Sequence, residues 1–470
     1  MLLCALLFAA FAAWSIHAAF KIGLFDVRAF YCGGAVVDAG DDPYRVEPLR
    51  TCEHGGDITM ARPGSGSVSP VPLPGYDLAF LGVLAKLPYP AAALLWEVAL
   101  WIAVGAAALA LWQLTGIDLA IVIAALLLSD GYLASFLGQI APFAVAGIAL
   151  AAWCASRARF PQAALCTTFA MCEPHLPPGS FLALALFAPA ARAAAAAGAV
   201  ALGALTLAAT GLVRSYEYVH EVLPRHALSE VTSEEQLSLT GLLHLAGLSD
   251  RAAVLGGELW YAAFLVAGIV VAARLAKAYH DDAFLVVIPA ACAVFGGTFV
   301  HASQMAAAIP ATLLLYAKMP QRRVALGLAL LLLCIPWTAF LEMLPVLPVE
   351  ALAFGFLAWN VLPNRRLAAV LTVVQLAGLI AACALFHVPH GGALTAATSP
   401  TAYSEDDWRL AVDAVFSHDA AFFLPLKLPT WCGLAIVLFM ALTAAWKAPT
   451  KDATIASARD AGKASAPRGG

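Results

Sequence analysis

One stretch of the chain, from Ala283 to Ala317, carries no charged residue for 35 residues. A helix needs about 20 apolar residues to cross the hydrocarbon core of a bilayer, so this stretch is too long for one crossing. It therefore predicts two passes that meet near Gly296, Gly297 and His301. Soluble domains contain about 25% charged residues, whereas this chain has 12% charged and 62% hydrophobic residues. Lipid is the expected solvent for most of it.

Further apolar runs extend this pattern along the chain. Residues 193–213 and 428–446 carry no charge, and residues 91–112 carry one, Glu97. Shorter runs predict the remaining spans, near 1–20, 117–133, 139–155, 161–177, 259–273, 324–341, 349–362 and 367–386. The first of these lacks the basic start of a secretory signal, so we assign it to a membrane helix. The fold class that follows is an all-α polytopic membrane protein of about 12–14 helices.

Basic residues in short loops indicate the orientation, because cytoplasmic loops of membrane proteins carry an excess of Lys and Arg. We expect residues 1–446 to form one membrane-embedded domain with three longer outer segments, 21–89, 214–251 and 387–429. The tail 447–470 is predicted to be disordered and cytoplasmic. A net charge of −4 argues against a nucleic-acid partner. The basic residues expected on the cytoplasmic side are Arg157, Arg159, Arg274, Lys277, Lys318, Arg322, Arg323, Arg365 and Arg366.

Ten cysteines are scattered along the chain without the spacing of a metal site. Most lie in apolar runs, but Cys32 and Cys52 both fall in the first outer segment. In an oxidising compartment these two could form a disulfide. The sequence leaves the free and the paired state open.

Two acidic positions in the first outer segment are candidates for chemistry. Asp26 lies a few residues beyond the first apolar helix, where a carboxylate can take a proton from a hydroxyl at head-group depth. It could also be a solvated carboxylate paired with Lys21 or Arg28. The segment GDDPY, residues 40–44, places two acids side by side. Adjacent acids permit a metal site, but Gly and Pro around them favour a turn.

Four residues at the ends or breaks of apolar segments are further candidates. Gln139 follows a glycine at a helix start, where its amide could bind a sugar or a neighbouring helix. Glu173 and His175 flank a proline that interrupts an apolar span. A broken helix at membrane depth is tolerated only where it is buried or lines a cavity, which makes both residues cavity candidates. His301 could bind a phosphate or a sugar hydroxyl, or serve as a satisfied core histidine.

Taken in order, these residues resemble glycosyltransferase family 87, a group of mannosyltransferase-like membrane enzymes. The resemblance extends over about residues 1–310 and depends on the order of the motifs, since each is short. Glu173 stands where the family more often has Lys. The matching residues are Asp26, Phe30, Tyr31 and Gly34; Gly40, Asp42, Pro43 and Tyr44; Gly138, Gln139 and Pro142; Glu173, Pro174 and His175; Gln236, Leu237, Ser238 and Leu239; and His301.

The resemblance implies a GT-C-type helical bundle in the inner membrane, with its active site on the extracytoplasmic side. It implies an inverting transfer of a mannose-like hexose or another sugar, from a polyprenyl-phosphate donor to a glycolipid or glycan acceptor. Asp26 would be the general base, and no cofactor or metal ion is expected. Substrate-binding roles are implied for Arg28, Tyr44, Gln139, Glu173, His175 and His301. Candidates for a cradle around the lipid phosphate are Arg28, Arg214, Arg225 and Lys427.

Two other classes of protein remain open. A transporter or flippase of lipid-linked sugars would also be polytopic, although such proteins usually place charged residues near the bilayer midplane and show internal repeats. Here Glu97 is the one deep carboxylate in a long span. A non-catalytic scaffold that binds a partner through its outer loops is the third possibility.

Overall fold

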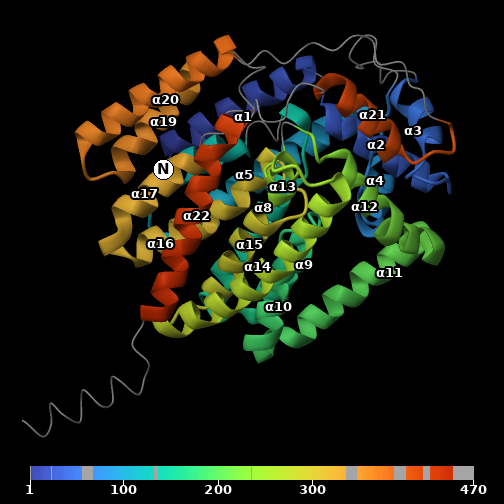
Figure 1. The fold of residues 1–470 in the computed structure, drawn as a ribbon. Coiled ribbons are helices and arrows are strands. Elements are labelled where there is room, and N and C mark those ends of the chain that lie inside the picture. The colour runs from blue at the N-terminus through green and yellow to red at the C-terminus, as the bar shows by residue number, and fades with distance from the viewer. Residues whose placement is uncertain are drawn as a thin grey trace, which may run out of the picture.

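The computed structural model describes residues 2–22, 24–55, 67–131, 136–233, 236–334, 347–385, 399–416 and 424–447. Within these ranges the protein is helical, and the extended pairings are two isolated bridges (Figure 1). The all-α class predicted from the apolar runs is confirmed. The predicted tail beyond residue 447 lies outside the described residues.

The long apolar helices have the length and composition of membrane spans. Four segments qualify among the described residues: α5 (Tyr89–Thr115), α14 (Asp250–Tyr279), the run Pro189–Ser229 and the part Lys427–Lys447 of α22 (Leu424–Lys447). The bent pair α1 (Leu2–Ile22) and α2 (Phe25–Asp38) makes a fifth candidate. This number is lower than the expected count of crossings, because six further apolar helices are only 10–17 residues long.

Six of the remaining helices lie at the positions of the shorter predicted spans: α6 (Leu119–Leu126), α8 (Ala141–Ala155), α9 (Phe160–Ala170), α17 (Arg323–Leu333), α19 (Leu347–Val361) and α20 (Arg365–Leu385). The helix α11 (Arg192–Glu217) covers the uncharged run 193–213, whereas α4 (Gly75–Leu84), α10 (Pro178–Phe187) and α13 (Leu239–Leu245) lie outside the predicted spans. Short irregular helices join them: η2 (Leu127–Gly131), η3 (Pro189–Ala191), η4 (Tyr218–Val222) and η6 (Pro320–Arg322).

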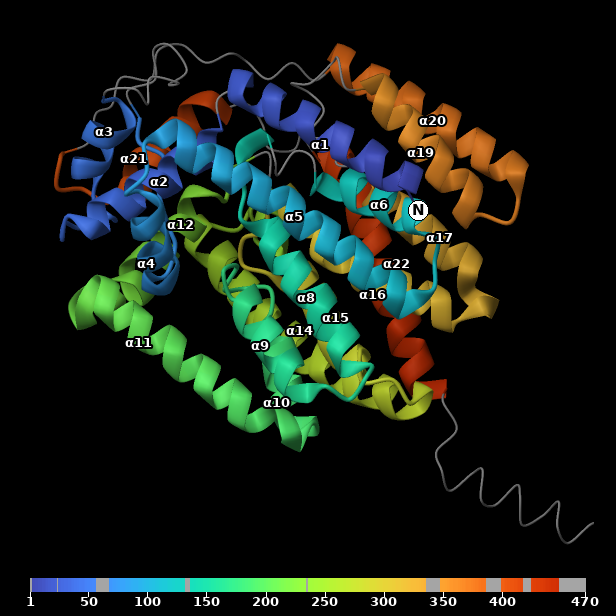
Figure 2. The same cartoon turned by 180° about the vertical axis from the view of Figure 1, so that it is seen from behind.

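The uncharged stretch 283–317 is broken where its length predicted. It consists of α15 (Phe284–Gly296), an irregular turn, η5 (Ala302–Ala308) and α16 (Ile309–Lys318). Both α15 and α16 are almost entirely buried, and they lie at the centre of the bundle with α8 and α14 (Figures 1 and 2). The break at His301 is therefore inside the protein rather than at a lipid-facing surface.

Small residues bring the central helices into close contact. Gly147 of α8 lies against Ala170 of α9, and Gly268 of α14 lies against Cys292 of α15. Membrane helices associate through such close packing, since lipid tails are as apolar as their side chains. The alanine-rich composition thus forms the core on which the ends of the bundle are built.

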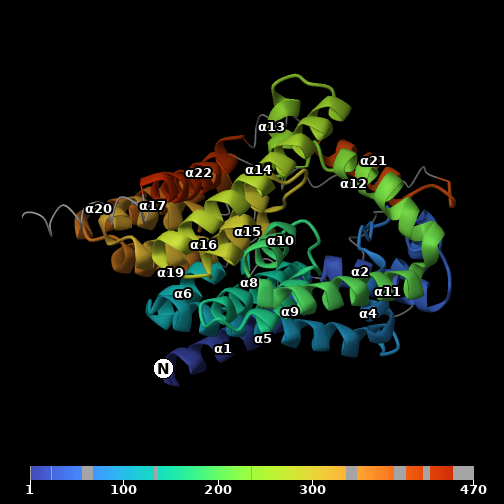
Figure 3. The ribbon, with the colours of Figure 1, turned by 90° about the horizontal axis from the view of Figure 1, so that it is seen from below.

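The two ends of the bundle differ in character. The Arg274 guanidinium of α14 lies 4.1 Å from the ring centre of Trp446 in α22, and Arg322 donates to the carbonyl of Met440. Two of the predicted basic turns, those of Arg274 and Arg322, therefore pack against the C-terminal half of α22, whose end lies on the left of Figure 3. The opposite end, on the right, holds α2, α3 (Val46–Glu53), α12 (Leu223–Ser229) and α21 (Ser404–Phe416). That the basic end faces the cytoplasm stays a prediction.

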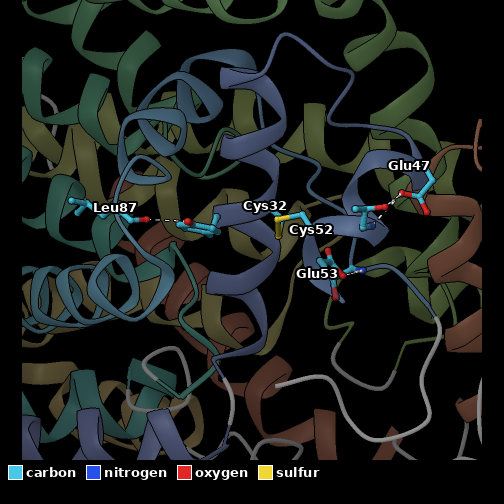
Figure 4. Close-up of a disulfide and its surroundings, with 8 residues drawn as sticks. Cys32, Glu47, Cys52, Glu53 and Leu87 are labelled. Carbon is cyan, nitrogen blue, oxygen red and sulfur yellow. Dashed lines mark hydrogen bonds between the residues drawn. A yellow bond between two sulfur atoms is a disulfide. The ribbon is translucent and has the colours of Figure 1, made fainter. Parts of the chain in front are cut away.

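A disulfide joins two elements of this second end. The structure pairs Cys32 of α2 with Cys52 of α3, which are 20 residues apart (Figure 4). Val46, at the start of α3, donates to the carbonyl of Ala402 just before α21. The first outer segment and the segment 399–416 are thus held together, and one of the two open possibilities for these cysteines is confirmed.

Candidate functional site

Asp26 lies in the first turn of α2, directly after the bend that separates this helix from α1. Leu24 forms the bend with a positive φ of 41°. A carboxylate in the first helical turn is favoured because it faces the positive end of the helix dipole. Gln139 approaches from a distant part of the chain and donates from Nε2 to Asp26 Oδ2 at 2.6 Å. Two residues selected independently from the sequence are therefore in direct contact.

The turn that presents Gln139 requires a glycine. Gly138 has a φ of +78°, and a β-carbon there would stand 1.9 Å from Cγ2 of Val27. Trp96 of α5 donates from Nε1 to the Gly138 carbonyl at 2.8 Å. Gly138 thus packs against Val27, the residue after Asp26, and is held in place by the buried indole of Trp96.

Glu173 lies in the predicted helix break, between the end of α9 and the start of α10. Its side chain is 5% exposed, and its Oε2 accepts a hydrogen bond from Gln304 Nε2 at 3.2 Å. The same oxygen lies 3.7 Å from Nδ1 of His175. The charge of Asp26 acts on Glu173, so the two predicted acids share one region of the protein.

His301 lies at the second helix break and is held through both its ring and its backbone. Its Nε2 is 3.2 Å from Glu230 Oε2, and its backbone carbonyl accepts the N–H of Gln304 at 3.0 Å. In return, the His301 backbone N–H donates to Gln304 Oε1 at 3.0 Å. Gln304 therefore connects His301 to Glu173, which joins the two helix breaks.

Four residues of this region were not selected from the sequence: His226, Glu230, Gln304 and Trp408. Trp408 of α21 donates from Nε1 to Glu230 Oε1 at 2.6 Å. Burial alone would raise the pKa of Glu230, but the attraction and hydrogen bond of His301, with smaller contributions from His226 and Trp408, lower that pKa to about 2. The Glu230 carboxylate is therefore charged although it is only 4% exposed.

Two further histidines frame an aromatic ring beside this network. The ring centres of His175 and His226 lie 5.2 Å and 4.8 Å from that of Phe299. His175 Nε2 and His226 Nδ1 are buried and have no hydrogen-bond partner among the described residues. Buried polar atoms are normally paired, so these two nitrogens are positions where a bound ligand would supply the missing partner.

Arg28 and Tyr44 are the two remaining candidates, and both are buried. Arg28 is 3% exposed, and its Nε and Nη1 have no hydrogen-bond partner among the described residues. Tyr44 is fully buried, donates to the Leu73 carbonyl and stacks on Tyr218. These contacts hold Tyr44 in the core of this end of the bundle, and its role in substrate binding stays a prediction.

The segment GDDPY forms a turn, as its glycine and proline favoured. Asp42 Oδ1 accepts the backbone N–H of Tyr44 at 3.0 Å, and Oδ2 binds Arg45. In the part of the chain that the structure describes, no group of three or more His, Cys, Asp or Glu residues could hold a metal ion.

Three of the four cradle candidates already have protein partners. Arg214 donates to the Gly40 carbonyl, and Arg225 binds both carboxylate oxygens of Asp406. Lys427 donates to the carbonyls of Ser233 and Gln236. Arg28 is the candidate whose buried nitrogen atoms lack a partner in the described ranges.

Comparison with known proteins places these residues in a family context. The sequence model of glycosyltransferase family 87 matches residues 74–300. This range includes Gln139, Glu173, His175 and Glu230 and ends one residue before His301, whereas Asp26 precedes it. No match was found among curated proteins or among solved structures.

Proposed function

Because this chain belongs to glycosyltransferase family 87, we propose that it transfers a sugar from a polyprenyl-phosphate donor to an acceptor hydroxyl at the extracytoplasmic membrane face. Membership makes the protein a membrane-bound glycosyltransferase. The donor, the acceptor, the side of the membrane and the role of Asp26 are our proposals. A mannose-like hexose is the sugar that the resemblance favours, and a glycolipid or glycan is the acceptor class.

The contact between Gln139 and Asp26 is the observation that supports this proposal most directly. A general base must be held in a defined orientation within hydrogen-bond reach of its substrate. The amide of Gln139 holds one carboxylate oxygen at 2.6 Å, and the turn at Gly138 fixes the amide itself. This fixed orientation supports Asp26 as the base that takes the proton of an acceptor hydroxyl.

The proposed reaction needs only groups that this chain contains. Asp26 takes the proton of the acceptor hydroxyl while the hydroxyl oxygen bonds to C1 of the sugar. The bond between C1 and the phosphate oxygen breaks, and its electron pair leaves with the polyprenyl phosphate. Attack from the face opposite the leaving group inverts the configuration at C1. The phosphate ester is already activated, so stabilising its departing charge completes the requirement.

Arg28 is our proposed ligand of the departing phosphate. A buried charge without a partner is unfavourable, and two of its guanidinium nitrogen atoms lack a hydrogen-bond partner among the described residues. The planar guanidinium also matches the geometry of a phosphate. For the sugar ring, His175 Nε2 and His226 Nδ1 offer buried hydrogen-bonding positions beside Phe299.

The test supplies purified protein in proteoliposomes with radiolabelled polyprenyl-phosphate mannose or glucose and an extract of membrane lipids as acceptor. We expect a labelled glycolipid or glycan from the native protein and none from Asp26→Ala or Asp26→Asn. Asp38→Asn is the matched control, because Asp38 lies at the other end of α2 and pairs with Lys86 at the surface. All variants are compared at equal amounts of folded protein.

Two outcomes would contradict the proposal. Full transfer by Asp26→Asn would remove Asp26 as the base. Label that crosses the membrane without forming a product, in the native protein, would support the flippase alternative instead.

A further inference from the structure

Glu230 connects three parts of the chain that are far apart in the sequence. It follows the end of α12, and its two carboxylate oxygens bind residues 71 and 178 positions away. Oε2 contacts Nε2 of His301 at the helix break, and Oε1 accepts from the indole of Trp408 in α21. Each oxygen is engaged by another side chain and the carboxylate is buried, so we infer that Glu230 acts through its neighbours.

The chemistry of both partners requires a carboxylate at this position. The indole of Trp408 can only donate a hydrogen bond. An ionised carboxylate can only accept hydrogen bonds, so the Nε2 atom of His301, 3.2 Å from Oε2 of Glu230, carries a proton and donates it. Two donors thus converge on one side chain, and only an ionised carboxylate offers two acceptor oxygens.

A chain of hydrogen bonds leads from Glu230 towards the two predicted acids. Glu230 binds His301, His301 and Gln304 bind each other, and Gln304 binds Glu173. The charge of Asp26 in turn acts on Glu173. The orientation of Glu173 therefore depends on a residue at the far end of this chain.

We propose that Glu230 is a positioning residue, which uses its two acceptor oxygens to join His301 to Trp408 and so fixes Glu173 and α21 around the reacting groups. This rests on the proposed function in one respect only, that the positioned groups serve sugar transfer. The joining itself is a property of the fold.

The decisive experiment compares Glu230→Gln, Trp408→Phe and the double variant. In Glu230→Gln the amide NH2 group must face one of the two donors, either His301 or Trp408. We therefore expect kcat to fall at least tenfold with little change in KM. Trp408→Phe removes one donor and keeps an aromatic ring against Phe25. In the double variant the glutamine oxygen can accept from His301 without conflict, so kcat should recover several-fold over Glu230→Gln alone.

A second measurement separates this proposal from the proposed function. The thermal unfolding midpoints of the native protein and of the three variants are measured. The losses of the two single variants should not add, and the double variant should be more stable than their sum predicts. Arg409→Gln is the control, because it removes a different contact of α21, the ion pair of Arg409 with Asp250 at 2.6 Å, and leaves Glu230 untouched. It should reproduce neither the kcat loss nor the recovery.

Each result has one meaning. Additive effects on unfolding overturn the joining role of Glu230. Non-additive unfolding with unchanged kcat in Glu230→Gln overturns its positioning role. If the native protein transfers none of the supplied sugars, the proposed function fails, while the unfolding data still decide whether Glu230 joins His301 to Trp408.

Discussion

Gly138 packs against Val27 so closely that a β-carbon on the glycine would stand 1.9 Å from Cγ2 of the valine. Gln139 follows the glycine and Asp26 precedes the valine, and these two neighbours are hydrogen-bonded to each other. The contact between a glycine and an apolar side chain thus sets the distance between an amide and a carboxylate.

Gly138→Ala should abolish transfer and lower stability. The added methyl overlaps Val27, and the positive φ of Gly138 costs any residue with a β-carbon roughly 1–2 kcal/mol. Adding Val27→Ala removes the nearest overlapping atom and should restore part of the stability and some activity. Unfolding midpoints and transfer rates of the two single variants and the double variant check this. Equal activity of Gly138→Ala and the native protein would show that the turn does not position Gln139.

Gln139→Leu should lower kcat while the protein stays folded. The lost hydrogen bond ends on a charged group, and such bonds contribute about 1.5–3 kcal/mol, which corresponds to a roughly 10- to 100-fold slower reaction. Gln113→Leu is a suitable control, since Gln113 accepts from Trp153 at an exposed site of α5. The measurement is the initial rate of transfer at saturating donor. A KM effect without a kcat effect would assign Gln139 to substrate binding instead.

Arg28→Met should raise the KM for the donor at least tenfold, because the substitution removes the guanidinium proposed to bind the phosphate. Arg28→Lys keeps the charge but loses the planar fork, so its KM should be intermediate. Arg214→Met is the control for loss of a guanidinium on the same side, since Arg214 is engaged by the Gly40 carbonyl. A fall in stability with unchanged donor KM would make Arg28 a counter-ion of Glu53 and not a substrate ligand.

The sequence predicted the scaffold more completely than the site. The length of the uncharged stretch located the break at His301, because a charge-free run longer than one crossing must turn. The order of short motifs selected Asp26 and Gln139 as candidates, although nothing in either segment predicts their hydrogen bond. Glu230 was missed because one acid in a polar segment resembles any surface acid. Nothing in the sequence around Trp408 indicates a partner for its indole, and only the fold shows its N–H directed at a carboxylate.

The pairing of Cys32 with Cys52 predicts a redox-dependent stability. Closing a loop of 20 residues stabilises a fold by about 3 kcal/mol in the chain-entropy account. The double substitution to Ser should therefore lower the unfolding midpoint, and reductant should lower that of the native protein but not that of the variant. Cys292→Ser, at a buried free thiol, is the control that keeps its sensitivity to reductant. A native midpoint that is unaffected by reductant would contradict the pairing.

Glu53, beside this disulfide (Figure 4), should make the end of the bundle that holds α2 and α3 less stable in alkali. Burial raises the pKa of its carboxyl to about 8, because the lowering effects of the Ser69 hydrogen bond and of Arg28 are weaker. In the unfolded chain a glutamate has a pKa of about 4.3. The folded protein therefore holds this proton more tightly. Its contribution to stability is complete below about pH 4 and is lost as the pH rises through 8. Glu53→Gln keeps the size and stays neutral, so its unfolding midpoint should match the native one at about pH 4 and exceed it at pH 9. Glu47→Gln controls for the loss of another carboxylate from α3, one that binds Thr51 at the surface. Equal midpoints of Glu53→Gln and the native protein at both pH values would show that Glu53 does not carry a raised pKa in the folded state.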